Sequence, residues 1–194
     1  MFIGPLEILD MILMIFVVGF IFKDTFKKPR KENEDVLERY LKRTSGFNWQ
    51  DFWFAVMVVA PAIILHEIGH KITALSYGLS ATFHAAYFWL LIGVVLKLVN
   101  FPFIFFVPAF VSIDGGASYA QSALIAFMGP AVNLVLFLTA FIVLKSNKKM
   151  KTKYFYFWTL TRNINLFLFI FNMIPIPGFD GFTVFSGLWH MAGL

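Results

Sequence analysis

The chain has 194 residues, of which 59% are hydrophobic and 14% charged, and its mean hydropathy is +0.77. A soluble domain is about 45–50% apolar and about 25% charged, and a chain this short has too little interior to bury 26 Phe side chains. The composition therefore excludes a soluble globular protein. Cysteine is absent, which excludes disulfides and thiolate chemistry, so any metal must be held by histidine and carboxylate.

The formal charge of +5 is concentrated in two short basic loops. Eight of the 16 Lys and Arg residues lie in 23–43, and five more lie in 145–153. Basic loops that flank apolar runs act as orientation signals and contact lipid headgroups. We therefore expect a lipid bilayer as the environment and no nucleic-acid partner.

Apolar stretches near the roughly 20 residues that span a bilayer recur along the chain. Residues 1–22 predict an anchor helix, and 23–50 is a polar connector with a surface helix expected over 33–44. The last stretch, 183–194, is apolar but too short to cross alone, which predicts a partial helix. Further spans are predicted at 52–77, 118–144 and 154–171. The fold class is therefore an all-α polytopic membrane protein with about four to five transmembrane helices.

The stretch between the second and third spans, 84–113, does not have the pattern of one continuous helix. Residues 86–99 are helix-like, whereas 101–113 mix aromatic and β-branched residues with two prolines and end in a Gly-containing turn. This pattern predicts a small membrane-embedded β-hairpin in a re-entrant segment. If both basic loops lie on one side of the membrane, spans two and three account for both crossings between them, and the 84–113 stretch makes no net crossing.

The second span carries the motif His66-Glu67-Ile68-Gly69-His70. Residues four apart lie on the same face of a helix, so both imidazoles can reach one zinc ion, and Glu67 can approach a water molecule beside it. The alternative is a pair of hydrogen-bonded core histidines. Ionisable groups at membrane depth cost at least about 2.5 kcal/mol each and normally mark a functional site, which favours the metal.

A tetrahedral catalytic zinc needs a third protein ligand. Asp180 is the candidate because it follows a span and is preceded by Pro175 and Pro177, which stop a helix and hold an extended segment. An ordinary loop aspartate is the alternative.

Three motifs follow one another along the chain. They are His66-Glu67-Ile68-Gly69-His70, Gly129-Pro130-Ala131-Val132-Asn133 and Asn172-Met173-Ile174-Pro175-Ile176-Pro177-Gly178-Phe179-Asp180-Gly181. Together they resemble the site-2 proteases, the intramembrane zinc metalloproteases of peptidase family M50, over about 52–185. The chain looks like the minimal archaeal or bacterial form without PDZ or CBS domains, and it departs from the family at Phe179, where Leu is usual. The resemblance implies one membrane-embedded metalloprotease domain over 1–194, with 51–185 as its catalytic core, in the cell membrane of a prokaryote.

The resemblance also implies residue roles. His66, His70 and Asp180 would bind one zinc ion per chain, and Glu67 would be the catalytic base. Asn172 would contact the substrate backbone or the developing oxyanion. The hairpin would add a strand to an unwound substrate. Gly129, Pro130 and Asn133 would allow close helix packing, with Pro175 and Gly181 completing the structural motif. His84 and His190 match no motif and are expected to be satisfied or interfacial histidines.

The expected activity is hydrolysis of peptide bonds in or near transmembrane segments of membrane-protein substrates. The alternative is a non-proteolytic membrane binding or chaperone protein with a structural or vestigial metal site, which would have no use for Glu67. A transporter is less favoured, because no second intramembrane carboxylate lines a path. The positive-inside rule puts the basic loops in the cytosol and the metal toward the outer face, whereas the family places its centre nearer the cytosol. Orientation, substrate, regulation and oligomeric state stay open.

Overall fold

The computed structural model describes residues 3–27, 29, 47–101, 107–147 and 149–193. The surface helix expected over 33–44 lies outside them. The elements in chain order are α1 (Pro5–Phe22), α3 (Trp49–Ser76), β1 (Ser80–Ala85), α4 (Tyr87–Leu98), β2 (Ala109–Asp114), α5 (Tyr119–Ser146), α6 (Thr152–Asn172) and α7 (Asp180–Met191).

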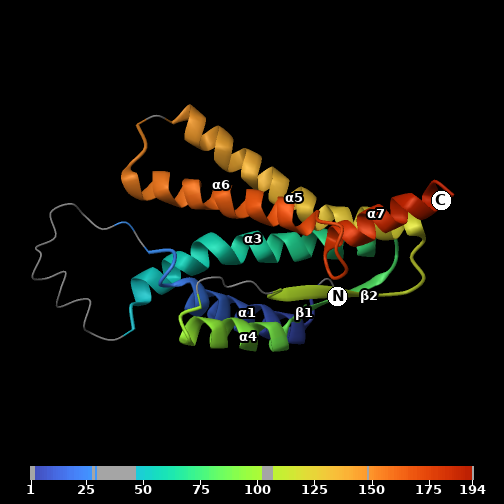
Figure 1. Cartoon of the computed structure of the whole chain (residues 1–194), viewed down its shortest axis with the longest axis horizontal. Coiled ribbons are helices and arrows are strands. Elements are labelled where there is room, and N and C mark those ends of the chain that lie inside the picture. The colour runs from blue at the N-terminus through green and yellow to red at the C-terminus, as the bar shows by residue number, and fades with distance from the viewer. Residues whose placement is uncertain (1–2, 28, 30–46, 102–106, 148, 194) are drawn as a thin grey trace, which may run out of the picture.

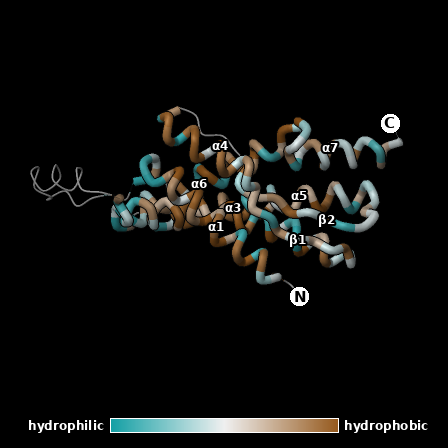
Figure 2. Tube along the Cα trace, turned by 90° about the horizontal axis from the view of Figure 1, so that it is seen from below, coloured by the Kyte–Doolittle hydropathy of each residue, from teal (hydrophilic) through white to brown (hydrophobic). Residues whose placement is uncertain are grey.

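The long helices run side by side along the long axis of the molecule, with α3 between the α5–α6 pair and the α1–α4 pair (Figure 1). Three of the described helices, α1, α3 and α5, are long and apolar enough to cross a membrane. Hydrophobic residues cover most of their length, and hydrophilic residues gather at the end where α3 begins (Figure 2). The predicted polytopic membrane fold is confirmed. The fourth predicted span corresponds to α6, a 21-residue helix beside α5.

Side-chain caps fix where the two longest helices begin. The Asn48 side chain accepts hydrogen bonds from the backbone N–H groups of Gln50 and Asp51 at the start of α3. Ser118 and Gln121 form a reciprocal capping box at the start of α5. These bonds satisfy N–H groups that a helix leaves unpaired in its first turn. Each helix then runs for 28 residues.

The two strands form an antiparallel sheet in which Ser80 pairs with Asp114 and Ala85 with Ala109. The small sheet was predicted, but one of its strands was not. Both strands were expected within 101–113, whereas the first strand is β1, which precedes α4. Residues 102–106 of that expected hairpin lie outside the described part. Strand pairing depends on tertiary neighbours more than on local propensity, so the sequence pattern could not identify the partner.

The segment between the strands contains α4, which matches the helix predicted at 86–99. Its first residue, Tyr87, donates its hydroxyl to Asp10 near the start of α1, and Lys97 Nζ donates to the Ile21 carbonyl near the end of α1 at 3.2 Å. The two helices therefore run parallel. Because Ala85 pairs with Ala109, the segment that contains α4 begins and ends at the same level along the bundle, as a re-entrant segment does.

Residues beside both basic loops lie at the same end of the helices. Lys23 Nζ, after α1, lies 5.1 Å from the ring centroid of Phe47, just before α3. The ring of Phe54, in the second turn of α3, stacks on Tyr156 of α6 at 5.8 Å. The ends of α1 and α5 and the beginnings of α3 and α6 thus form one end of the bundle, as the same-side assumption requires (Figure 1).

We expect cysteines placed at Lys27 and at Lys149 to react from the same side of the membrane. Both positions are exposed and lie beside this end of the bundle. The measurement is labelling of intact cells with an impermeant thiol reagent, which is direct in a chain without native cysteine. A cysteine at Gly116, in the exposed turn before α5, is the control and should react from the opposite side. Reactivity of Lys27→Cys and Lys149→Cys from different sides would contradict this arrangement.

Candidate metal centre

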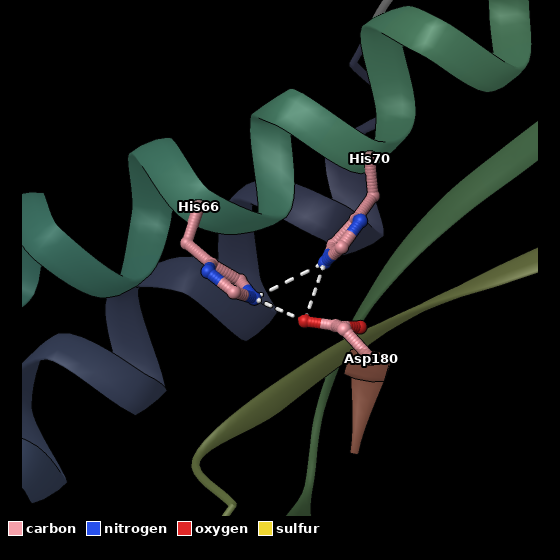
Figure 3. A group of neighbouring side chains, drawn as sticks. All are labelled: His66, His70 and Asp180. Carbon is pink, nitrogen blue, oxygen red and sulfur yellow. Dashed lines mark hydrogen bonds and ion pairs between the residues drawn. The ribbon is translucent and has the colours of Figure 1, made fainter. Parts of the chain in front are cut away.

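Three side chains that the sequence nominated as ligands meet at one point. His66 and His70 lie one turn apart on α3, and Asp180 is the first residue of α7 (Figure 3). His66 Nε2 lies 3.1 Å from His70 Nε2 and 3.1 Å from Asp180 Oδ2, and His70 Nε2 lies 3.4 Å from the same oxygen. Among the described residues, this is the cluster of three or more ligand-type side chains that could hold a metal.

The other nitrogen of each imidazole fixes its tautomer. His70 Nδ1 lies 2.7 Å from the Ile125 carbonyl oxygen, which can only accept, so Nδ1 donates. His66 Nδ1 lies 2.6 Å from Asn133 Oδ1 and donates to it in the same way. In a neutral imidazole, an N–H on Nδ1 leaves a lone pair on Nε2. Two lone pairs and a carboxylate oxygen therefore face one another, an arrangement that a cation stabilises.

The spacing of these atoms fits zinc. Ligand bonds of about 2.0–2.1 Å in a tetrahedral site place neighbouring donors about 3.3 Å apart, and two imidazoles with one carboxylate form a donor set that zinc accepts. Gly129 of α5 leaves the necessary room, since a Cβ there would come within 2.2 Å of His70 Nε2 and 2.7 Å of His66 Nε2. The glycine of the second motif thus serves the ligands directly, in addition to helix packing.

The turn between α6 and α7 delivers Asp180. Gly178 has a φ of +97°, a conformation that glycine adopts readily. A Cβ on Gly181 would come within 2.4 Å of the Met173 backbone, so this glycine lets the first turn of α7 press against the end of α6. The partial helix expected from 183 therefore begins earlier, at the ligand itself.

Asn133 has a more specific environment than close packing. Its Nδ2 donates to the Ala62 carbonyl at 3.0 Å and to Asn165 Oδ1 at 3.0 Å, while its Oδ1 accepts from His66. Asn165 in turn donates to the Thr161 carbonyl at 2.8 Å. The two asparagines are 0% and 1% exposed, so their amide groups are satisfied by protein alone. Together they hold the His66 ring in the orientation described above.

Sequence reasoning missed Asn165. The available signal was an amide side chain inside an apolar span, where polar groups seek partners across helices. Its partner, Asn133, lies 32 residues away on another helix, so no local spacing pattern connects the two.

Glu67 is buried and borders two cavities that meet at the ligands. One cavity, of about 500 Å³, is lined by the three ligands, by β2 and by Asn172 at the end of α6. The other, of about 420 Å³, is lined mainly by apolar side chains of α3 and α6, again with His66, Glu67 and Asn172. Asn172 and Glu67 therefore line both cavities beside the proposed ligands.

The two histidines without a motif have partners elsewhere. His84 Nε2 lies 3.0 Å from Ser112 Oγ across the sheet. The His190 ring stacks on Tyr119 with 4.4 Å between centroids. Neither residue lines the cavity that contains the ligands.

We expect Asn133→Ala to weaken zinc binding by about 10–100-fold, the usual effect of removing a hydrogen-bond partner of a ligating histidine. Asn133→Asp keeps an acceptor for His66 Nδ1 and should retain more of the affinity than the alanine variant. Competition with a chromogenic chelator on purified protein measures both. Thr139→Ala, an exposed position on the same helix, is the control. Equal affinities in the Ala and Asp variants would argue against a role for the Asn133 oxygen.

Comparison with known proteins agrees with this geometry. Residues 53–193 match the family model described as Peptidase family M50. The chain is 30% identical over 192 residues to a protein of Methanocaldococcus jannaschii described as a "Putative zinc metalloprotease", and the match covers 97% of this chain and 89% of that protein. No solved structure matches at a comparable level. The chain therefore belongs to peptidase family M50, the site-2 protease family, and is a membrane-bound zinc metalloprotease.

Proposed function

We propose that this protein cuts peptide bonds in or near the transmembrane segments of membrane-protein substrates. The position of the site along α3 carries the proposal. His66 lies 17 residues after Trp49 and 10 before Ser76, or about 26 Å and about 15 Å from the two ends of a helix at 1.5 Å per residue. A metal centre at that depth in a membrane-crossing helix is within reach of bonds inside the bilayer.

In this proposal His66, His70 and Asp180 hold the zinc ion, and Glu67 is the general base. A bound zinc ion supplies Lewis-acid activation of a carbonyl and of water. Glu67 takes a proton from the attacking water and returns it to the leaving amine nitrogen as the C–N bond breaks. Asn172 directs its side-chain amide toward the substrate carbonyl. The remaining glycine, proline and asparagine positions of the motifs hold these groups in place.

The two cavities support an apolar, extended substrate. The apolar residues that line the second cavity include Val59 and Ile63 of α3 and Leu160, Ile164 and Phe167 of α6. β2 borders the first cavity, and strand addition to a free sheet edge gives an unwound chain the hydrogen-bond partners that lipid lacks. A chain that passes from one cavity to the other crosses the ligands beside Glu67.

The same observations support the proposed domain and cellular assignments. A single domain over 1–194 is supported by α1, which packs on α3, β1 and α4, and a core at 51–185 agrees with the family match. An archaeal relative supports the cell membrane of a prokaryote, with the bilayer and a transmembrane protein as partners. A binding or chaperone role is disfavoured, because the cluster offers three ligand side chains and borders open space beside Glu67.

We expect Glu67→Gln to keep about one zinc per chain and to lose at least about 100-fold in cleavage rate, since the amide preserves shape but cannot accept the proton. The assay combines metal analysis with incubation of purified protein and a panel of single-span substrates, with and without a zinc chelator. Asp180→Ala is the comparison variant and should lose zinc as well. Appreciable turnover by Glu67→Gln would assign water activation to another group.

Substrate helix stability should control the rate. A bond in an intact helix has its carbonyl in the i to i−4 ladder, so cleavage requires local unwinding. Gly or Pro near the cut should accelerate turnover relative to a Leu run, because helix propensities differ by about 0.8–3 kcal/mol per residue. The measurement is kcat/KM for matched substrates that differ at two positions. Equal values for the two sets would mean that unwinding does not limit the reaction.

A further inference from the structure

Two carboxylates of α1 face the outer edge of strand β1. Glu7 and Asp10 lie three residues apart, on one face of the helix. Glu7 Oε1 accepts from the Phe83 backbone N–H at 2.7 Å, and Asp10 Oδ2 accepts from the Ala85 N–H at 3.1 Å. Alternate residues of a strand direct their backbone groups to the same edge. Two successive donors on the edge of β1 that faces away from β2 are therefore occupied by side chains.

Lys71 occupies the neighbouring acceptor on the same edge. Its Nζ donates to the Ala81 carbonyl at 2.8 Å and also forms a buried ion pair with Glu7. The side chains of Lys71 and Glu7 are 3% and 8% exposed. Lys71 directly follows the proposed ligand His70 on α3. The outer edge of β1 is thus joined both to α1 and to the helix that carries the metal centre.

Among the described residues, the sheet consequently keeps one edge, that of β2, for a further strand. The inner edge of β1 pairs with β2 along its whole length, and its outer edge is occupied as described. β2 borders the cavity that contains the three ligands, through Ala109, Phe110, Val111 and Ile113. An unpaired strand edge is a template for pairing with another chain. Because the outer edge of β1 is occupied, an added strand is directed to the edge of β2.

We propose that Glu7, Asp10 and Lys71 are positioning residues that close the outer edge of β1 and hold the sheet against α3, so that an extended substrate pairs with β2 beside the metal centre. The inference rests on the proposed function. It also gives a role to Glu7 and Lys71, which are buried ionisable groups of a kind that is costly unless paired. The competing role is an ion pair that only joins α1 to α3.

Two double variants distinguish these roles. Glu7→Leu with Lys71→Met replaces a buried ion pair by apolar residues of similar volume, a change that proteins often tolerate. It leaves the Phe83 N–H and the Ala81 carbonyl on the outer edge of β1 without these partners. Glu7→Lys with Lys71→Glu restores opposite charges but places a cation at the Phe83 N–H. If the ion pair only joins the helices, the second variant should recover the wild-type amide exchange at Phe83 and the wild-type KM. If these residues close the edge of β1, neither double variant should recover the wild-type amide exchange or KM.

Amide hydrogen exchange tests the edge without any substrate. In both double variants the Phe83 amide should exchange about tenfold faster, with zinc content unchanged. Asp10→Ala should accelerate exchange at Ala85, whereas Asp10→Asn, which keeps an acceptor, should not. Leu6→Ala, exposed on the same turn of α1, is the control. Unchanged exchange in the Glu7 and Asp10→Ala variants would overturn the proposal, even if the chain proved to have no protease activity.

Cross-linking then tests where the substrate pairs. Phe110 and His84 are register partners, so cysteines at these positions sample the same level of β2 and β1. In a Glu67→Gln background, a cysteine-bearing single-span substrate should cross-link to position 110 and not to position 84. In the Glu7→Leu, Lys71→Met background, cross-linking at position 84 should appear and KM should rise more than kcat falls. Equal cross-linking at both positions with Glu7 and Lys71 intact would overturn the proposal. If amide exchange changes as expected but the protein cleaves no substrate, the proposed function alone would be overturned.

Discussion

The site depends on a convergence of electron pairs that the protein itself does not neutralise. The Ile125 carbonyl and the Asn133 amide oxygen hold protons on the Nδ1 atoms of two imidazoles, which turns both Nε2 lone pairs toward the Asp180 carboxylate. Without a cation these atoms repel one another. The packing of α3, α5 and α7 therefore brings like charge density together, and a bound zinc ion would offset the repulsion.

Gly129 shows how closely the helix packing and the chemistry are connected. The space occupied by any larger side chain at this position is the space that the two Nε2 atoms need. α5 consequently contributes the space at Gly129, the Asn133 amide and the Ile125 carbonyl, but no ligand. α6 contributes Asn165 behind that amide and Asn172 beside the cavity, so every long helix on this side of α3 supports the same imidazoles or the space beside them.

Local patterns made part of this structure predictable. Continuous apolar runs gave the spans at 1–22 and 118–144 to within a few residues of α1 and α5, and the i, i+4 spacing of His66 and His70 identified two candidate ligands. The β1–β2 pairing, the Asn133–Asn165 bond and the contact of Glu7 with Phe83 join residues far apart in the chain, 76 positions in the last case. No spacing rule reports such contacts, because they arise only when the helices have packed. Local spacing therefore could not connect Glu7 with Lys71, which lies 64 positions away.

The edge of β2 has a further consequence for the products of the reaction. Backbone donors and acceptors on one edge of a strand repeat every two residues, or about 6.6 Å. A chain paired with this edge keeps all its hydrogen bonds when it slides by two residues and loses them when it slides by one. Successive registers would then bring alternate peptide bonds to the ligands, and fragment ends from one substrate would differ in length by even numbers of residues.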